Sequence, residues 1–151
     1  MKHLNKFYNR ANIPWVDLVW SKYYTTKVPH AARELGPFWW KDVLKLNTIF
    51  RGVTRCELGN GSSICFWDDL WADSVLSQTY PRLASFARNE EASVREVMQA
   101  DDRDSLFLLP LSQQALEELQ NQLQDIPYDD DATDKWVPIW GQHLYFVMVL
   151  V

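Results

Sequence analysis

The sequence predicts an α+β chain, mainly helical, with a central β-hairpin at about residues 54–67 and a short C-terminal hairpin. Three observations carry this prediction. Apolar residues recur at helical spacing in several segments. A Gly-Asn-Gly turn at 59–61 separates two strand-like runs, which is the strongest short-range signal for a hairpin. Two further strand-like runs follow residue 133 near the end of the chain.

Two helices are expected in the first third of the chain. Residues 14–24 open with Pro14, and proline suits the first position of a helix. Pro37 opens a second helix over residues 37–50, which Gly52 ends. One stripe of this second helix is apolar and contains Trp39, Trp40, Val43, Leu46 and Phe50.

Three shorter helices are expected further along. Pro81 begins one over residues 81–87. Ser93 and Glu96 match a capping box, which begins a helix that reaches about residue 99. Ser112 caps a helix over residues 113–125, whose apolar stripe contains Leu116, Leu119, Leu123 and Ile126.

The central hairpin pairs residues 54–58 with residues 63–67. With Asn60 and Gly61 at the turn, Cys56 lies opposite Cys65 at a position where side chains approach closely. A disulfide is geometrically conceivable there. The alternative is two reduced thiols packed side by side, and an intracellular chain favours this alternative.

The C-terminal hairpin joins residues 134–140 to residues 144–150 around Gly141. The run from Leu144 to Val151 is nearly all apolar, so an uncovered strand there would aggregate or self-associate. Self-association through this run is therefore one expected kind of partnership. The same run is a sign that the chain is cut short or altered at its end.

Charge is distributed unevenly along the chain. Residues 1–55 carry ten Lys/Arg and three Asp/Glu, a net charge of +7, whereas the remainder carries a net charge of −12. Only the first third is therefore suited to a polyanion. Basic side chains beside aromatic rings can track phosphates and stack on bases. The candidate nucleic-acid-binding residues are Lys41, Lys45, Arg51, Arg55 and Trp39. The alternative is a solvated basic helix face whose tryptophans, like Trp67 and Trp71, belong to the core.

No pattern in the sequence predicts catalysis, a metal or a cofactor. Phe66-Trp67-Asp68-Asp69 resembles the paired carboxylates of a polymerase palm, but no third carboxylate lies in a suitable strand. Cys56 and Cys65 are nine residues apart and lack the local spacing of a zinc site. Neither a nucleophile motif nor a phosphate-binding loop is present. We therefore expect no enzyme activity, no catalytic residues, no bound metal and no cofactor.

Targeting signals are also missing from the sequence. No run reaches the roughly 18 apolar residues that a membrane helix needs. The N-terminus lacks the basic and then apolar pattern of a secretion signal. We expect an intracellular protein of the nucleus or cytoplasm, without a membrane partner.

Several short motifs, taken in order, resemble a known family. They are Gly36-Pro-Phe-Trp-Trp-Lys-Asp-Val43, Leu58-Gly-Asn-Gly61, Ile64-Cys-Phe-Trp-Asp-Asp-Leu-Trp71, Tyr80-Pro-Arg-Leu83, the stretch 106–119 and Asp134-Lys-Trp-Val-Pro-Ile-Trp-Gly141. Together they resemble the segment of plant LINE-type (non-LTR) retrotransposon polyproteins between the reverse transcriptase domain and the zinc-binding domain. In such a segment Trp71 is expected in the core and Asp69 as a turn or helix cap.

The resemblance implies three parts. Residues 1–36 would form an N-terminal helical segment and linker, residues 37–126 a connector domain, and residues 127–151 the start of a truncated zinc-binding-type domain. The polymerase residues and the Cys/His cluster of the family are absent, so its catalytic activity does not carry over. The expected function is a non-catalytic connector with weak binding of RNA or DNA. The alternatives are a protein-interaction module or a non-functional remnant of a degenerate element.

Overall fold

The computed structural model describes residues 1–25, 29 and 35–139. Its elements in chain order are α1 (Lys2–Tyr8), α2 (Pro14–Tyr23), α3 (Phe38–Leu44), α4 (Asn47–Gly52), β1 (Thr54–Glu57), α5 (Leu76–Thr79), α6 (Pro81–Ser85), α7 (Val94–Met98), the 3-10 turn η2 (Asp104–Leu106), α8 (Gln113–Gln124) and β2 (Lys135–Pro138). The mainly helical α+β class is thus confirmed. No helix in the described part of the chain is long and apolar enough to cross a membrane.

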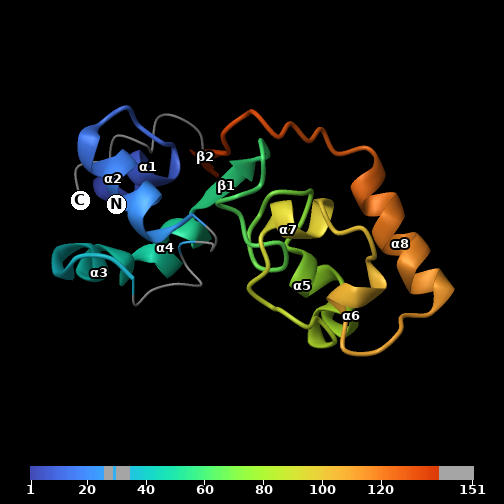
Figure 1. The fold of residues 1–151 in the computed structure, drawn as a ribbon. Helices are drawn as coiled ribbons and strands as arrows, with labels where there is room; N and C mark the ends of the chain where they lie inside the picture. The colour runs from blue at the N-terminus through green and yellow to red at the C-terminus, as the bar shows by residue number, and fades with distance from the viewer. Residues whose placement is uncertain (26–28, 30–34, 140–151) are drawn as a thin grey trace.

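Helices gather on both sides of the two-stranded sheet (Figure 1). Helices α1 to α4 lie on one side and are called the N-terminal lobe below. Helices α5 to α8 lie on the other side and are called the C-terminal lobe. The strands β1 and β2 lie between the two, although 77 residues separate Glu57 of β1 from Lys135 of β2 in the chain.

Aromatic rings fill the core of the N-terminal lobe. Phe7 stacks on Trp20 with ring centroids 4.5 Å apart, and it contacts Trp40 at 4.4 Å. Tyr8 packs against Trp136 of β2 at 4.6 Å. These contacts cross the predicted boundary between residues 36 and 37, since Phe7 and Trp40 lie on opposite sides of it. The division into three parts stays a prediction.

Local sequence signals place most helices correctly. Pro14 begins α2, and both hydrogen bonds of the Ser93–Glu96 capping box are present at α7. The Ser112 side chain accepts a hydrogen bond from the Ala115 N–H and caps α8. Helix α6 begins at Pro81, as expected. Helix α1 was not predicted from the sequence.

The helix predicted over residues 37–50 is two helices, α3 and α4, which break at Lys45 and Leu46. The break exposes Leu46 and buries Asn47, whose Oδ1 accepts a hydrogen bond from the Tyr8 hydroxyl at 2.8 Å. The prediction that Leu46 belongs to a continuous buried apolar stripe is therefore wrong. Turning the chain here lets Trp40 and Phe50 both enter the core, and burial of large aromatic side chains dominates core energetics.

The predicted central hairpin at 54–67 is wrong. Strand β1 pairs antiparallel with β2, which places Cys56 opposite Trp136 and not opposite Cys65. Cys65 forms an isolated bridge with Ser93 instead. The first run of the predicted C-terminal hairpin is thus strand β2, and its partner is β1. The second run, 144–150, lies outside the described residues, as does the self-association predicted for it.

The loop after β1 does not form a hairpin turn; it wraps around the carboxylate of Asp134. Asp134 Oδ1 accepts hydrogen bonds from the Gly59 N–H at 3.0 Å and the Gly61 N–H at 2.8 Å. Its Oδ2 accepts from the Ser63 N–H at 2.9 Å and the Ser63 hydroxyl at 2.8 Å. Successive backbone N–H groups that face one centre form an anion-binding nest, and here the anion comes from the chain itself. A Cβ on Gly59 would lie 2.6 Å from the Ala132 carbonyl, so this close approach requires glycine.

Both cysteines are free and buried. The reduced state expected for an intracellular chain is present, although the two residues are not cross-strand partners. Burial raises the pKa of the Cys65 thiol to about 11, with the nearby Asp69 carboxylate adding to the rise. Burial also raises the pKa of Cys56 well above its ordinary value. Because the thiolate is the reactive form, both side chains are poor nucleophiles at neutral pH.

We expect slow alkylation of the native protein and fast alkylation of the unfolded one. N-ethylmaleimide at neutral pH should leave Cys56 and Cys65 unmodified while the fold is intact, because the buried thiols stay protonated. In denaturant, mass spectrometry should find both of the two thiols modified. Modification of either cysteine at the same rate with and without denaturant would contradict this burial.

Candidate nucleic-acid interface

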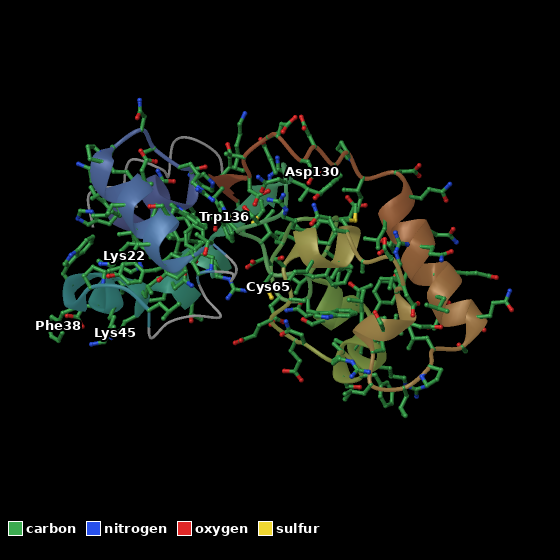
Figure 2. The ribbon with its side chains drawn as sticks, viewed as in Figure 1. Lys22, Phe38, Lys45, Cys65, Asp130 and Trp136 are labelled. Atoms are coloured by element: carbon green, nitrogen blue, oxygen red, sulfur yellow. The ribbon has the colours of Figure 1, made fainter. Side chains whose placement is uncertain are left out.

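Helix α3 carries most of the residues predicted to bind nucleic acid. It begins after Pro37, whose backbone is extended, with φ −66° and ψ 160°. Trp40 and Leu44, four residues apart, are both buried and fix one side of the helix against the core. The remaining surface of the helix faces solvent and carries Lys41, and Lys45 at the C-cap is exposed as well. Figure 2 shows Phe38 and Lys45 at the outer side of this helix, away from the C-terminal lobe.

Two aromatic rings are open to solvent at the start of α3. Phe38 is 83% exposed and Trp39 is 45% exposed. The indole of Trp39 rests edge-on against Trp15 at 5.6 Å and Trp40 at 5.8 Å, which holds its orientation. A fixed and half-open ring can stack on a base at low entropic cost. Phe38 was missed from the sequence, although the run of three aromatic residues contained the signal.

The two lysines of α3 differ in their surroundings. Lys45 Nζ lies 2.6 Å from Asp42 Oδ1, in an exposed ion pair that solvent screens. Lys41 is exposed and has no ion-pair partner within the residues that the structure describes. Lys22 of α2 is another exposed cation of the N-terminal lobe, and its Nζ lies 5.3 Å from the centroid of the Tyr23 ring.

Arg51 is not a surface cation. Its guanidinium Nε donates to Asp69 Oδ1, and only 15% of the Arg51 side chain is exposed. Burial alone would lower the pKa of Arg51, but the attraction of Asp69 and its hydrogen bond outweigh burial and raise the pKa. Arg51 therefore serves first as the partner of Asp69, and little of its guanidinium is open to a phosphate.

Asp69 is the buried end of this pair. Oδ2 of Asp69 accepts a hydrogen bond from the Cys65 N–H at 2.6 Å, so its expected role as a turn cap is present. Burial raises the pKa of Asp69 to about 6, against the opposing effects of Arg51 and the Cys65 N–H. Trp71, expected in the core, is buried, and its indole N–H donates to the Phe66 carbonyl.

Arg55 lies on the exposed side of β1, where Nη2 is 4.0 Å from Glu57 Oε1. It thus comes from a different element than the lysines of α3. The five predicted residues divide into three exposed residues at α3 (Trp39, Lys41 and Lys45), the exposed Arg55 on the sheet, and the largely buried Arg51. The two lysines share one face of the helix, and Trp39, two residues before Lys41, points to another side.

The described residues contain no group of three or more His, Cys, Asp or Glu side chains arranged to hold a metal ion. Asp68 is exposed while Asp69 is buried and paired, so the two adjacent carboxylates do not face a common centre. Comparison with protein-family models, curated proteins and solved structures finds no match to this chain.

Proposed function

We propose that this chain is a non-catalytic connector of a retrotransposon reverse transcriptase polyprotein, and that it binds single-stranded nucleic acid weakly through α3. One observation supports this proposal above the others. A single short helix, held by the buried Trp40, carries two exposed aromatic rings and two exposed lysines. Such a surface can combine phosphate contacts with base stacking, which is how sequence-independent binding of single strands works.

The connector role draws support from contacts between distant parts of the chain. The Asn9 side chain mimics a strand next to β2, because its Nδ2 donates to the Trp136 carbonyl at 3.1 Å and its Oδ1 accepts from the Trp136 N–H at 2.8 Å. Asp134 holds the loop of Gly59 to Ser63 in the same region. These contacts fix the N-terminal lobe to the sheet, and a spacer between two modules needs such rigidity.

The uneven charge of the chain determines where on the protein a nucleic-acid strand would lie. The basic first third of the chain supplies α3, whereas residues from 56 onward carry a net charge of −12. An acidic lobe repels phosphates, so a strand would lie along α3 and away from the C-terminal lobe. Because few cations contribute, the affinity should be low and should fall steeply with salt.

Fluorescence anisotropy with a short labelled single-stranded RNA tests this proposal. The Lys41→Gln/Lys45→Gln variant should bind more weakly than the wild type, and its salt slope should be smaller by about 1 to 1.5 between about 50 and about 200 mM salt. The control Arg82→Gln/Arg103→Gln removes the same charge from the C-terminal lobe and should retain wild-type binding. Equal losses in the two variants, or no binding at low salt, would rule out α3 as the interface.

A second candidate function, a protein-interaction module, is favoured by the C-terminal lobe. Phe86, Leu108 and Leu109 are large apolar side chains that the fold leaves exposed. Exposed apolar residues that lie close together often mark a site of protein interaction. Their chain neighbours Arg88 and Phe107 line a pocket, which gives this candidate a specific form.

A further inference from the structure

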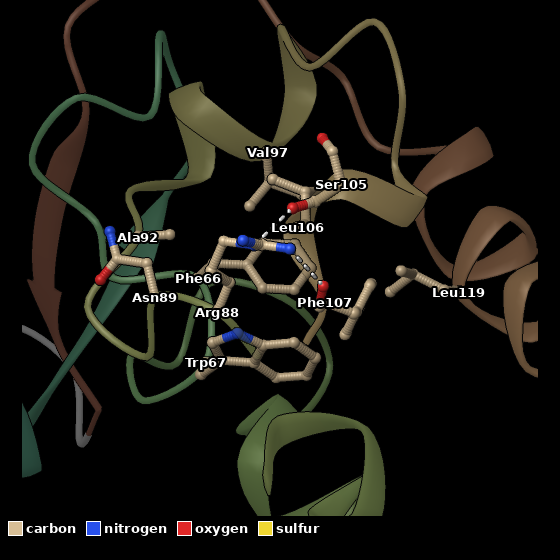
Figure 3. Close-up of a pocket in the computed structure, with 10 residues that line it drawn as sticks. All are labelled: Phe66, Trp67, Arg88, Asn89, Ala92, Val97, Ser105, Leu106, Phe107 and Leu119. Atoms are coloured by element: carbon tan, nitrogen blue, oxygen red, sulfur yellow. Dashed lines mark hydrogen bonds between the residues drawn. The ribbon is translucent and has the colours of Figure 1, made fainter. Parts of the chain in front are cut away.

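The C-terminal lobe encloses a small apolar pocket with a volume of about 100 Å³. Its walls include Phe66, Trp67, Ala92, Val97, Phe107 and Leu119 (Figure 3). The indole of Trp67 and the ring of Phe107 meet edge to face with centroids 6.2 Å apart. These walls come from four segments of the lobe, so the pocket is part of the folded core and not a surface irregularity.

Arg88 lines this pocket and brings a positive charge to it. Its Nε donates to the Ser105 carbonyl at 3.1 Å, and its Nη2 donates to the Phe107 carbonyl at 3.3 Å. Figure 3 shows both hydrogen bonds, which join Arg88 to the neighbouring segment that carries Ser105 and Phe107. Among residues 1–25 and 35–139, no carboxylate forms an ion pair with Arg88. The guanidinium is thus oriented by backbone carbonyls and keeps N–H groups for an anion.

An exposed apolar strip lies next to Arg88. Ala87 and Phe107 form an antiparallel bridge and are both buried. The neighbouring hydrogen bonds run from the Arg88 N–H to the Leu106 carbonyl and from the Leu108 N–H to the Phe86 carbonyl, each at 2.8 Å. Since side chains alternate along these bridged segments, Leu108 lies on the same side as Arg88. Phe86 accepts the backbone hydrogen bond of Leu108, and Leu109 follows in the chain, so the three residues form an exposed apolar strip next to Arg88.

We propose that this pocket binds the C-terminal residue of a partner protein, with an aliphatic side chain inside the pocket and the terminal carboxylate on Arg88. The pocket is smaller than the roughly 150 Å³ cavity that holds benzene, so a Val or Leu side chain fits better than an aromatic ring. Arginine pairs with a carboxylate in a strong, charge-assisted contact. The inference rests on the second candidate function and is independent of nucleic-acid binding.

The surroundings of the pocket favour a peptide over a free organic acid. A small acid would fill the pocket and leave the strip of Phe86, Leu108 and Leu109 uncovered. The preceding residues of an extended peptide would lie along that strip and bury it. The acidic charge of this part of the chain further favours a partner with lysines upstream of its apolar end.

Fluorescence polarisation with the full chain tests the proposal. The probe is a labelled hexapeptide that has two lysines followed at its end by two leucines and a free carboxyl group. We expect saturable binding, weakened about tenfold or more when the carboxyl group is replaced by an amide or when Arg88 is replaced by Gln. The matched control Arg82→Gln removes an exposed cation from α6 and should bind like the wild type.

Two further measurements separate the alternatives. The exposed-strip variant Leu108→Ser should weaken the peptide but leave the thermal midpoint unchanged, because Leu108 is not part of the core. Equal binding of the acid and the amide would overturn the proposal, as would a lack of binding up to about 1 mM peptide. Displacement of the peptide by an equal concentration of 3-methylbutanoate would overturn it in favour of a small-acid site. None of these outcomes depends on whether α3 binds RNA.

Discussion

Replacing Arg51 by Met should lower the free energy of unfolding by about 3–5 kcal/mol, the usual cost of leaving one partner of a buried ion pair without the other. Asp69 is almost fully buried, and the Arg51 Nε donates a hydrogen bond to its Oδ1. Methionine keeps much of the apolar stem of arginine and removes only the charge and the hydrogen bond. Urea denaturation followed by circular dichroism measures the change.

The matched control for this variant is Lys45→Met. Lys45 and Asp42 form an ion pair of similar length on the surface, with exposed fractions of 77% and 51% for the two side chains. Such a pair contributes about 0–1 kcal/mol. If the two variants lose the same free energy, burial does not distinguish the two pairs and the structural role assigned to Arg51 is wrong.

The effect of Arg51→Met should also depend on pH. Burial raises the folded-state pKa of Asp69 from 3.8 to about 6, so the folded state holds this proton more tightly than the unfolded state. The contribution of this group to stability is therefore complete below about pH 4 and is lost as the pH rises through 6. Without Arg51, which lowers the pKa of Asp69, this loss grows. The deficit of the variant should be largest above pH 6 and shrink as the pH falls toward 4.

The sequence predicts those elements whose signals are local. Pro14 at a helix start, the Ser93–Glu96 capping box and the Ser112 cap each act within four residues, and each is present in the structure. Trp71 in the core follows from its size and apolar surface in the same way. None of these predictions requires knowledge of which distant segments meet.

The failed hairpin shows what local signals leave out. Gly-Asn-Gly at 59–61 favours a tight turn, but the N–H groups of Gly59 and Gly61 bind Asp134. A carboxylate more than 70 residues away thus supplies the acceptor, and β2 replaces the expected second strand as partner of β1. The glycines that favour a turn in the sequence thus allow the backbone to come close enough to bind Asp134.

The candidate interface could be predicted only in part, because some of its residues are grouped by local helical spacing and others depend on long-range contacts. Lys41 and Lys45 are four residues apart, so their grouping follows from helical spacing, whereas Trp39, two residues before Lys41, points to a different side of the helix. Arg51 follows the same spacing in the sequence, but its partner Asp69 comes from a separate loop. Phe38 is exposed because Trp40, two residues further on, turns inward, which only the packed structure reveals.

Replacing Asp134 by Ala should lower the free energy of unfolding by about 3 kcal/mol or more. The change leaves the N–H groups of Gly59, Gly61 and Ser63 without their acceptor, together with the Ser63 hydroxyl. Each buried donor that loses its partner costs about 1–3 kcal/mol, reduced where water enters the space. Trp136 is affected as well, because its indole N–H donates to the Ser63 hydroxyl oxygen at 3.2 Å.

Asp129→Ala is the control, because Asp129 is exposed and its Oδ1 accepts only a local hydrogen bond from the Asp131 N–H among the contacts that the structure describes. It should cost less than about 1 kcal/mol. Hydrogen exchange gives a second readout, since the amides of Gly59, Gly61 and Ser63 should lose protection in Asp134→Ala before the amides of α7 do. Equal unfolding midpoints for the two variants would show that the loop holds its shape without the carboxylate. Such a result would return the Gly-Asn-Gly segment to the role of an ordinary turn, and the pairing of β1 with β2 would then depend on the strand ladder, the Asn9–Trp136 hydrogen bonds and the Tyr8–Trp136 packing.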